Sequence, residues 1–165
     1  MATLKQFKAR KEYVCSKCGR KIQKGEQYYR FSISRFSPLK PRCLNCKPKR
    51  SEMTQSEFLS RIYEIEETIE AIESVEEIEE VISELEELME ETEEKLYNMP
   101  EQLQDSEVGM LLQERIDYVQ EMIDQLEELK SELESLEDEE IDEKEKEERK
   151  EEILSEIQSV SYSGS

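Results

Sequence analysis

The sequence predicts a mainly α-helical protein, in which a small four-cysteine zinc β-hairpin module precedes a long antiparallel helical hairpin packed as a coiled coil. Three observations predict this fold class: two C-x-x-C pairs, a change from basic to acidic composition near residue 50, and apolar residues spaced by three and four thereafter. The expected divisions are a basic flexible tail over residues 1–12, a zinc-binding module over 13–50, the coiled-coil hairpin over 54–137 and a charged helical or disordered tail over 138–165.

All four cysteines of the chain fall into two pairs, Cys15 with Cys18 and Cys43 with Cys46, and the chain contains no histidine. Two intervening residues let one tight turn aim both thiolates of a pair at a single tetrahedral ion, and the second pair completes the coordination. Gly19 follows the first pair, where such a turn often needs a positive φ. Four sulfur ligands leave no open position, so we expect a structural zinc ion, with two disulfides or a redox dithiol as alternatives.

The segment between the cysteine pairs has room for one β-hairpin. Residues 24–26 are typical of a turn, and residues 27–33 alternate in polarity as a half-buried strand does, with Tyr29, Phe31 and Ile33 on one side. A module of this size cannot bury an adequate core, so bound metal is expected to supply much of its folding free energy.

Charge is divided sharply along the chain. Residues 1–50 contain 15 Lys and Arg against two Glu, whereas residues 51–165 contain 8 Lys and Arg against 41 Asp and Glu. Cations interleaved with aromatic rings suit phosphate contacts and base stacking, so the module is a candidate nucleic-acid-binding surface. The candidate nucleic-acid-binding residues are Lys17, Arg20, Lys21, Tyr28, Arg30, Arg35, Lys40, Arg42, Lys47, Lys49 and Arg50.

The acidic part of the chain predicts two long helices. A capping box at Thr54–Glu57 opens a helix of about 45 residues that ends before Pro100, with a slip of the apolar spacing at Val75 that should overwind a supercoil locally. A second periodic run covers residues 108–136, and the short connection favours antiparallel packing. The stripe of apolar residues on these two helices is wider than the contact between two helices needs, which suggests a third helix or a partner. Residues expected in the buried seam include Ile69, Ile72, Leu85, Leu126 and Leu133.

Three stretches, at residues 53–60, 98–104 and 111–116, resemble a group of small uncharacterised proteins of tailed bacteriophages. Those proteins are similar in layout, with a lysine-rich head followed by a glutamate-rich helical pair, and the resemblance covers most of residues 10–136. It implies a phage or prophage context. The group carries no established activity, so the resemblance assigns no functional residue.

An enzyme is not expected, because the chain lacks histidine and has neither a Walker-type loop nor a G-x-G-x-x-G motif. Residues 1–5 lack the apolar core of a signal peptide, and no long apolar run occurs. These features favour the cytoplasm, which for a phage protein is the cytoplasm of the bacterial host.

The sequence thus predicts a non-catalytic zinc-binding accessory protein that contacts nucleic acid through residues 1–50. The alternative is an adaptor or inhibitor whose acidic helices bind a protein partner, for example as a DNA mimic. These helices lie within residues 54–137, and they could instead self-associate. Neither binding to a membrane nor a small-molecule substrate is expected.

Overall fold

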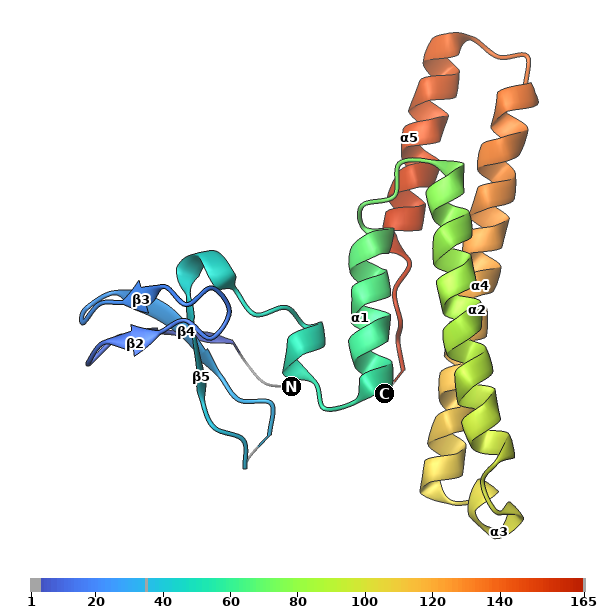
Figure 1. Ribbon diagram of the computed structural model, residues 1–165. Helices are drawn as coiled ribbons and strands as arrows, with labels where there is room; N and C mark the ends of the chain where they lie inside the picture. The colour runs from blue at the N-terminus through green and yellow to red at the C-terminus, as the bar shows by residue number, and fades with distance from the viewer. Residues whose placement is uncertain (1–3, 35, 165) are drawn as a thin grey trace. The chain divides into compact units, whose positions relative to one another are not determined.

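The computed structural model describes residues 4–34 and 36–164, and the chain divides into two compact units on either side of the Ser60–Arg61 bond. The first unit carries the short strands and the cysteines, and the second is built from helices (Figure 1). The protein is therefore mainly helical, with a small antiparallel sheet and a four-cysteine cluster, as the sequence predicts.

In the first unit, the described residues form two small antiparallel sheets. The larger has the order β1-β4-β5, and the smaller pairs β2 with β3. The strands are β1 (Lys5–Lys8), β2 (Tyr13–Val14), β3 (Lys21–Ile22), β4 (Gln27–Phe31) and β5 (Lys40–Cys43), followed by the 3-10 helices η1 (Leu44–Cys46) and η2 (Ser51–Met53). β4 and β5 form the predicted hairpin between the cysteine pairs, and Tyr28 lies opposite Cys43 in its register.

The prediction of a flexible tail over residues 1–12 is wrong for residues 5–8, which form strand β1 along β4. The ring of Phe7 lies 6.5 Å from that of its cross-strand partner Tyr28, and Ala9 is 3 % exposed in the core of the unit. Lysines occupy both ends of the strand, and their charge obscures the alternating apolar positions in the sequence. This strand gives the module a third strand that a hairpin alone would lack.

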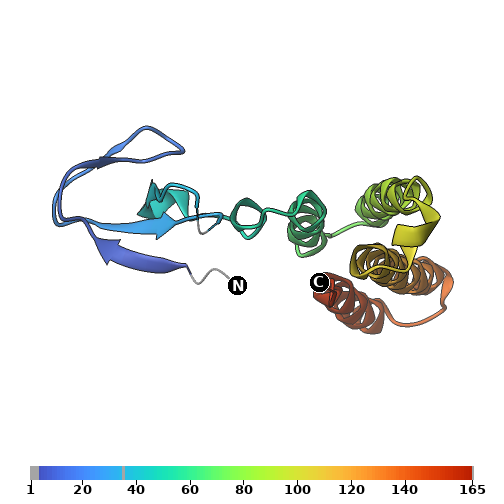
Figure 2. The same cartoon turned by 90° about the horizontal axis from the view of Figure 1, so that it is seen from below.

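The described residues of the second unit form five helices. They are α1 (Glu57–Ile69), which begins in the first unit, α2 (Val75–Tyr97), α3 (Glu101–Gln104), α4 (Glu107–Asp138) and α5 (Glu143–Ser159). α2 lies alongside α4, and α5 lies alongside the other end of α4, in both views (Figures 1 and 2). α3 occupies the turn between α2 and α4.

A single helix of about 45 residues is not observed, because the helix stops at Ile69 and restarts at Val75. Ser74 caps α2: its hydroxyl accepts a hydrogen bond from the Glu77 N–H at 3.4 Å, and the Glu77 carboxylate accepts one from the Ser74 N–H at 3.1 Å. Such a capping box stabilises a helix start, so the slip at Val75 marks a new helix and not an overwound supercoil. At the start of α1, Ser56 takes the capping role predicted for Thr54, since its hydroxyl accepts from the N–H three residues on.

Residues 138–165 were expected to be either helical or disordered. Within that range α5 is a helix, so the helical expectation holds over Glu143–Ser159. Ile157 is fully buried and Tyr162 is 7 % exposed. The Gln158 side-chain amide donates to the Ile72 carbonyl at 3.0 Å, which joins the end of α5 to the α1–α2 connection. α1 and α5 thus cover the apolar surface that is too wide for two helices.

The core of the helical unit consists of aliphatic side chains from α1, α2, α4 and α5. The five seam residues predicted to be buried are at most 4 % exposed: Ile69, Ile72, Leu85, Leu126 and Leu133. Coiled-coil packing of this core stays a prediction. No helix in the described part of the chain has both the length and the apolar character needed to cross a membrane.

Replacing Leu126 with Ala should lower the free energy of unfolding of the helical unit by about 2–4 kcal/mol, because the side chain is fully buried and its removal leaves a cavity. Urea titration followed by helical circular dichroism measures this change. Met110→Ala is the control, since Met110 is 64 % exposed and its loss should cost less than about 0.5 kcal/mol. Equal small effects of both substitutions would contradict the assigned core.

Candidate metal centre and basic surface

The four cysteine sulfurs gather at one point of the first unit. All lie within 4.8 Å of one another, and the Cys18 and Cys43 sulfurs are 3.7 Å apart. Four sulfurs placed tetrahedrally at zinc–thiolate distance from one ion would be separated by roughly 3.8 Å, so the cluster has the size that a tetrahedral metal ion requires. All four are free thiols, and their separation does not match the short bond of a disulfide.

Local backbone geometry positions each pair. Gly19 has φ 71°, as predicted for the turn after the first pair, and its N–H donates to the Cys15 carbonyl at 3.0 Å. The second pair lies where β5 ends at Cys43 and passes into η1. The Ser16 N–H donates to the Pro41 carbonyl at 2.9 Å, so a backbone hydrogen bond joins the first cysteine turn to the strand that leads into the second.

Tyr28 belongs to the core beside the cysteines, so its predicted role as a base-stacking residue is wrong. It is 3 % exposed and its ring stacks on that of Tyr13 at 5.0 Å, in a cluster with Cys15, Cys43 and Ile22. Burial raises the pKa of its hydroxyl. Because Tyr28 pairs with Cys43 across β4 and β5, strand register places it on the cysteine side of the sheet.

The surroundings of Cys15 and Cys46 shift the pKa values of these two thiols in opposite directions. Burial raises the pKa of Cys15, but backbone N–H donors of Cys18, Cys43 and Lys17 outweigh it and lower the pKa to about 6. Hydrogen bonding to Cys18 and Cys43 raises the pKa of Cys46 to about 12. Four thiols this close cannot all ionise without a compensating charge, and a divalent cation bound among them would supply that charge.

Arg42 is a structural residue of the module and not an accessible phosphate ligand. It is 7 % exposed, its guanidinium lies 5.6 Å from the centre of the Phe31 ring, and it forms an ion pair with Glu52 at 2.5 Å. Burial of the Glu52 carboxylate is outweighed by the Lys49 N–H and the Arg42 guanidinium, which lower its pKa. The prediction of Arg42 as a nucleic-acid-binding residue is therefore wrong.

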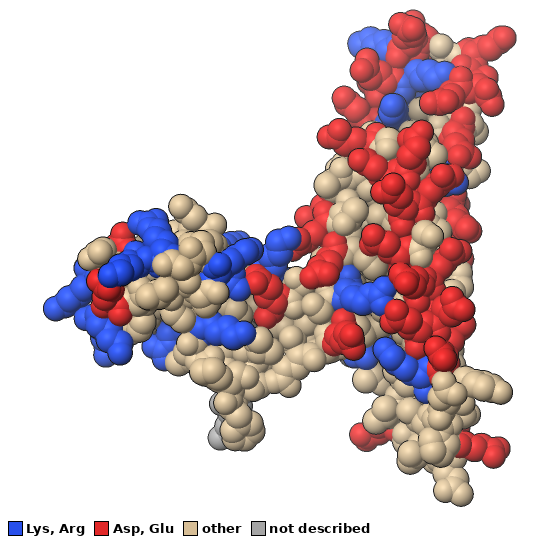
Figure 3. Space-filling model, viewed as in Figure 1, with Lys and Arg blue, Asp and Glu red and all other residues tan. Residues whose placement is uncertain are grey.

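The other predicted cations mostly lie on the surface of the first unit (Figure 3). Arg20 pairs with Glu26 at 3.2 Å, and Lys21 pairs with Glu12 at 3.4 Å. Arg35 lies outside the described residues. The exposed members of the predicted set are Lys17, Arg20, Lys21, Arg30, Lys47, Lys49 and Arg50, and Lys40 is half-buried.

Strand β1 adds exposed cations within the range that was predicted to be a flexible tail. Lys5 pairs directly with Arg30 across β1 and β4, so these two positive charges share one face of the sheet. Lys8 is exposed at the other end of the strand. Lys8 lies between Phe7 and Ala9, and this alternation of a charged residue with apolar ones is the sequence signal for the strand.

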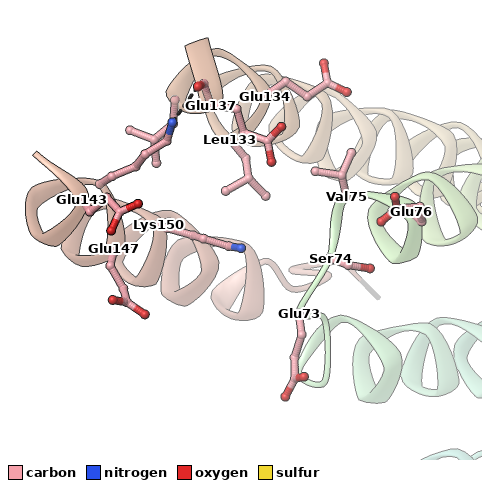
Figure 4. A pocket seen from close by; sticks show the side chains of 12 residues that line it. Glu73, Ser74, Val75, Glu76, Leu133, Glu134, Glu137, Glu143, Glu147 and Lys150 are labelled. Atoms are coloured by element: carbon pink, nitrogen blue, oxygen red, sulfur yellow. Dashed lines mark hydrogen bonds between the residues drawn. The ribbon is translucent and has the colours of Figure 1, made fainter. Parts of the chain in front are cut away.

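The helical unit carries a separate cavity of about 620 Å³ between the start of α2, the end of α4 and α5 (Figure 4). Its lining includes the buried Leu133, and Lys150 extends into it from α5 towards Ser74. The carboxylates that line it are Glu73, Glu76, Glu134, Glu137, Glu143 and Glu147. The cavity is thus strongly acidic with an apolar base, which suits a cationic group on an aliphatic stem.

Replacing Cys18 with Ser should abolish stoichiometric zinc binding and unfold residues 13–46, because three remaining sulfurs no longer enclose the ion. Native mass spectrometry measures the bound metal, and circular dichroism should show that the helices remain. Lys17→Ser is the control, since Lys17 is exposed in the same turn and offers no sulfur ligand. Two disulfides and no zinc in the native protein would contradict the assignment.

Replacing Glu52 with Gln should accelerate zinc release about 5- to 30-fold, because Arg42 then keeps a buried charge without its carboxylate partner. The rate is measured with an excess of a chromophoric chelator, which reports opening of this unit alone. Glu12→Gln is the matched control: it removes one carboxylate from an exposed pair with Lys21 and should leave the rate within about twofold. Equal rates in both variants would show that the Arg42 pair does not hold the module closed.

Comparison of the chain with protein-family models, with curated proteins and with solved structures found no match.

Proposed function

We propose that this chain is a non-catalytic zinc-binding accessory protein whose basic module contacts nucleic acid. The helical unit serves as its oligomerisation or partner-binding body, with α2 and α4 packed as an antiparallel coiled-coil hairpin. The phage or prophage context implied by the resemblance is part of the proposal, and it gives the bacterial host cytoplasm as the compartment.

Zinc is proposed as the metal because all four donors are sulfur. Cys15, Cys18, Cys43 and Cys46 would hold the ion, and the 3.7 Å separation of two of their sulfurs fits tetrahedral thiolate coordination. A site with four protein ligands has no place for substrate or water, so the ion's role is to stabilise the fold. The two cysteine turns then hold the β1-β4-β5 sheet and its cations in a fixed arrangement.

The observation that carries the nucleic-acid proposal is the placement of cations on a rigid sheet. Lys5 and Arg30 face the same side from neighbouring strands, and Lys8 adds an exposed cation at the end of β1. The described carboxylates of residues 4–50 are only Glu12 and Glu26, both already paired with a cation. A surface with this excess of positive charge attracts phosphates and releases their counterions.

The acidic cavity supports a second candidate function, in which the helical unit binds a basic protein partner. Six glutamates surround an apolar base, while Lys146 and Lys150 are the cations among the lining residues. Lys150 shows that an ammonium group fits in this space (Figure 4). A partner with a Lys or Arg beside an apolar anchor has the complementary chemistry. This function corresponds to the adaptor or inhibitor alternative, and it leaves the module as a zinc-stabilised appendage.

The nucleic-acid proposal predicts salt-sensitive binding by the full-length protein. Fluorescence anisotropy with a labelled oligonucleotide should give an affinity that falls steeply with salt, with a slope reporting several phosphate contacts. Reversing Lys5 and Arg30 to Glu should weaken binding about 10-fold or more at low salt and reduce the slope by roughly two.

Lys95→Glu with Lys144→Glu is the matched control, because it changes the net charge equally but on exposed positions of the helical unit. It should leave the salt slope unchanged. If both double variants weaken binding equally, net charge alone explains the interaction and the assigned surface is wrong. If the wild-type protein shows no salt-sensitive binding, the nucleic-acid proposal fails and the basic-partner function takes its place.

A further inference from the structure

The loop between β4 and β5 presents one aromatic ring to solvent. Phe36 is 92 % exposed, although a Phe side chain is strongly favoured in the interior. Leu39, three residues on, is 51 % exposed. The loop is closed by the pairing of Phe31 with Lys40, so a positive residue stands where the chain re-enters the sheet.

Serine hydrogen bonds connect the described residues of this loop. The Ser32 hydroxyl donates to the Ser37 carbonyl at 2.9 Å, and the Ser34 and Ser37 hydroxyls are 2.8 Å apart. The Phe36 N–H itself donates to the Ser34 hydroxyl at 3.3 Å. The Gln55 side-chain amide donates to the Ile33 carbonyl, which ties the loop to residues after the module. The backbone of Phe36 is therefore held by a hydrogen bond while its ring remains exposed.

The other aromatic rings of the larger sheet have partners within the module. Tyr28 stacks on Tyr13 in the core, and Phe31 lies against the Arg42 guanidinium. The Arg30 guanidinium lies 5.6 Å from the centre of the Phe7 ring, and the Tyr29 hydroxyl accepts a hydrogen bond from Gln6. Phe7 is 40 % exposed and the three strand residues Tyr28, Tyr29 and Phe31 are buried or half-buried, so Phe36 offers a more accessible ring face than any of them.

We propose that Phe36 stacks on an unpaired base and that the ligand of the basic module is single-stranded nucleic acid. This inference rests on the proposed nucleic-acid function and adds to it the class of ligand and the contact residue. An exposed flat ring on a strongly basic unit has the two components of single-strand recognition, a stacking platform and cations for the backbone. In a duplex the faces of the bases are covered by their neighbours, so Phe36 would have no partner there.

The chain contains no tryptophan, so Phe36→Trp places a unique fluorophore at the proposed contact. In the full-length variant, emission of the introduced indole should be strongly quenched by an oligothymidylate of about 20 nucleotides and little changed by a duplex of the same length. This difference is expected because only the single strand offers a free base face to the ring.

Phe36→Ala should weaken oligothymidylate binding about 5- to 100-fold, leave duplex binding within about twofold, and keep the salt slope. Leu39→Ala is the control for loss of an exposed apolar side chain from the same loop, and it should leave both affinities within about twofold. Zinc content verifies that each variant is folded.

The outcomes separate this inference from the function on which it rests. Salt-sensitive binding with unchanged indole emission in Phe36→Trp and a wild-type affinity in Phe36→Ala would overturn the stacking role and leave the nucleic-acid function standing. Equal losses for oligothymidylate and duplex in Phe36→Ala would overturn the single-strand preference. No binding of either probe by the wild-type protein would overturn both proposals, and Phe36 would then be a contact for a protein partner.

Discussion

The approach of four cysteine sulfurs to within 4.8 Å is the constraint on which the first unit depends. The unit buries few side chains around Cys15, Cys43 and Tyr28, and such a small core supplies little folding free energy by itself. A shared divalent cation would compensate the charge of the crowded sulfurs and connect two turns that are distant in sequence. The β4–β5 hairpin ends at Cys43 and also carries Arg42 and the loop with Phe36, so the position of the cysteines is linked to both.

The charge division of the chain is consistent with two different ways of stabilising its units. A module held by a bound metal ion would need few apolar residues, which would leave its surface for the cations on β1 and β4. The helical unit instead has continuous apolar seams, and glutamates cover its exposed faces, where their carboxylates stay hydrated. A nucleic acid and a basic protein, the two proposed ligands, would consequently be attracted to different units of the same chain. Matched charge reversals in the two units show which unit is responsible for salt-sensitive binding, and this distinguishes between the two ligands.

The sequence predicted correctly those features that depend on one clear signal each. The cysteine spacing predicted the cluster, Gly19 the positive φ, and the apolar periodicity predicted buried Leu85 and Leu126. The predictions failed where two signals compete. Tyr28 lies in a strand with apolar residues on both faces, so alternation alone could not place it. The S-x-x-E pattern at Ser74 was a cap signal inside a continuous periodic run, and the periodicity hid it.

X-ray absorption at the zinc edge of the purified full-length protein tests the central claim most directly, because it reports the ligand atoms around the metal. The four-cysteine account predicts a first shell of four sulfurs at about 2.3 Å, with no nitrogen or oxygen ligand. A shell containing oxygen or nitrogen, or a protein that carries no zinc and has its cysteines paired as disulfides, would contradict it.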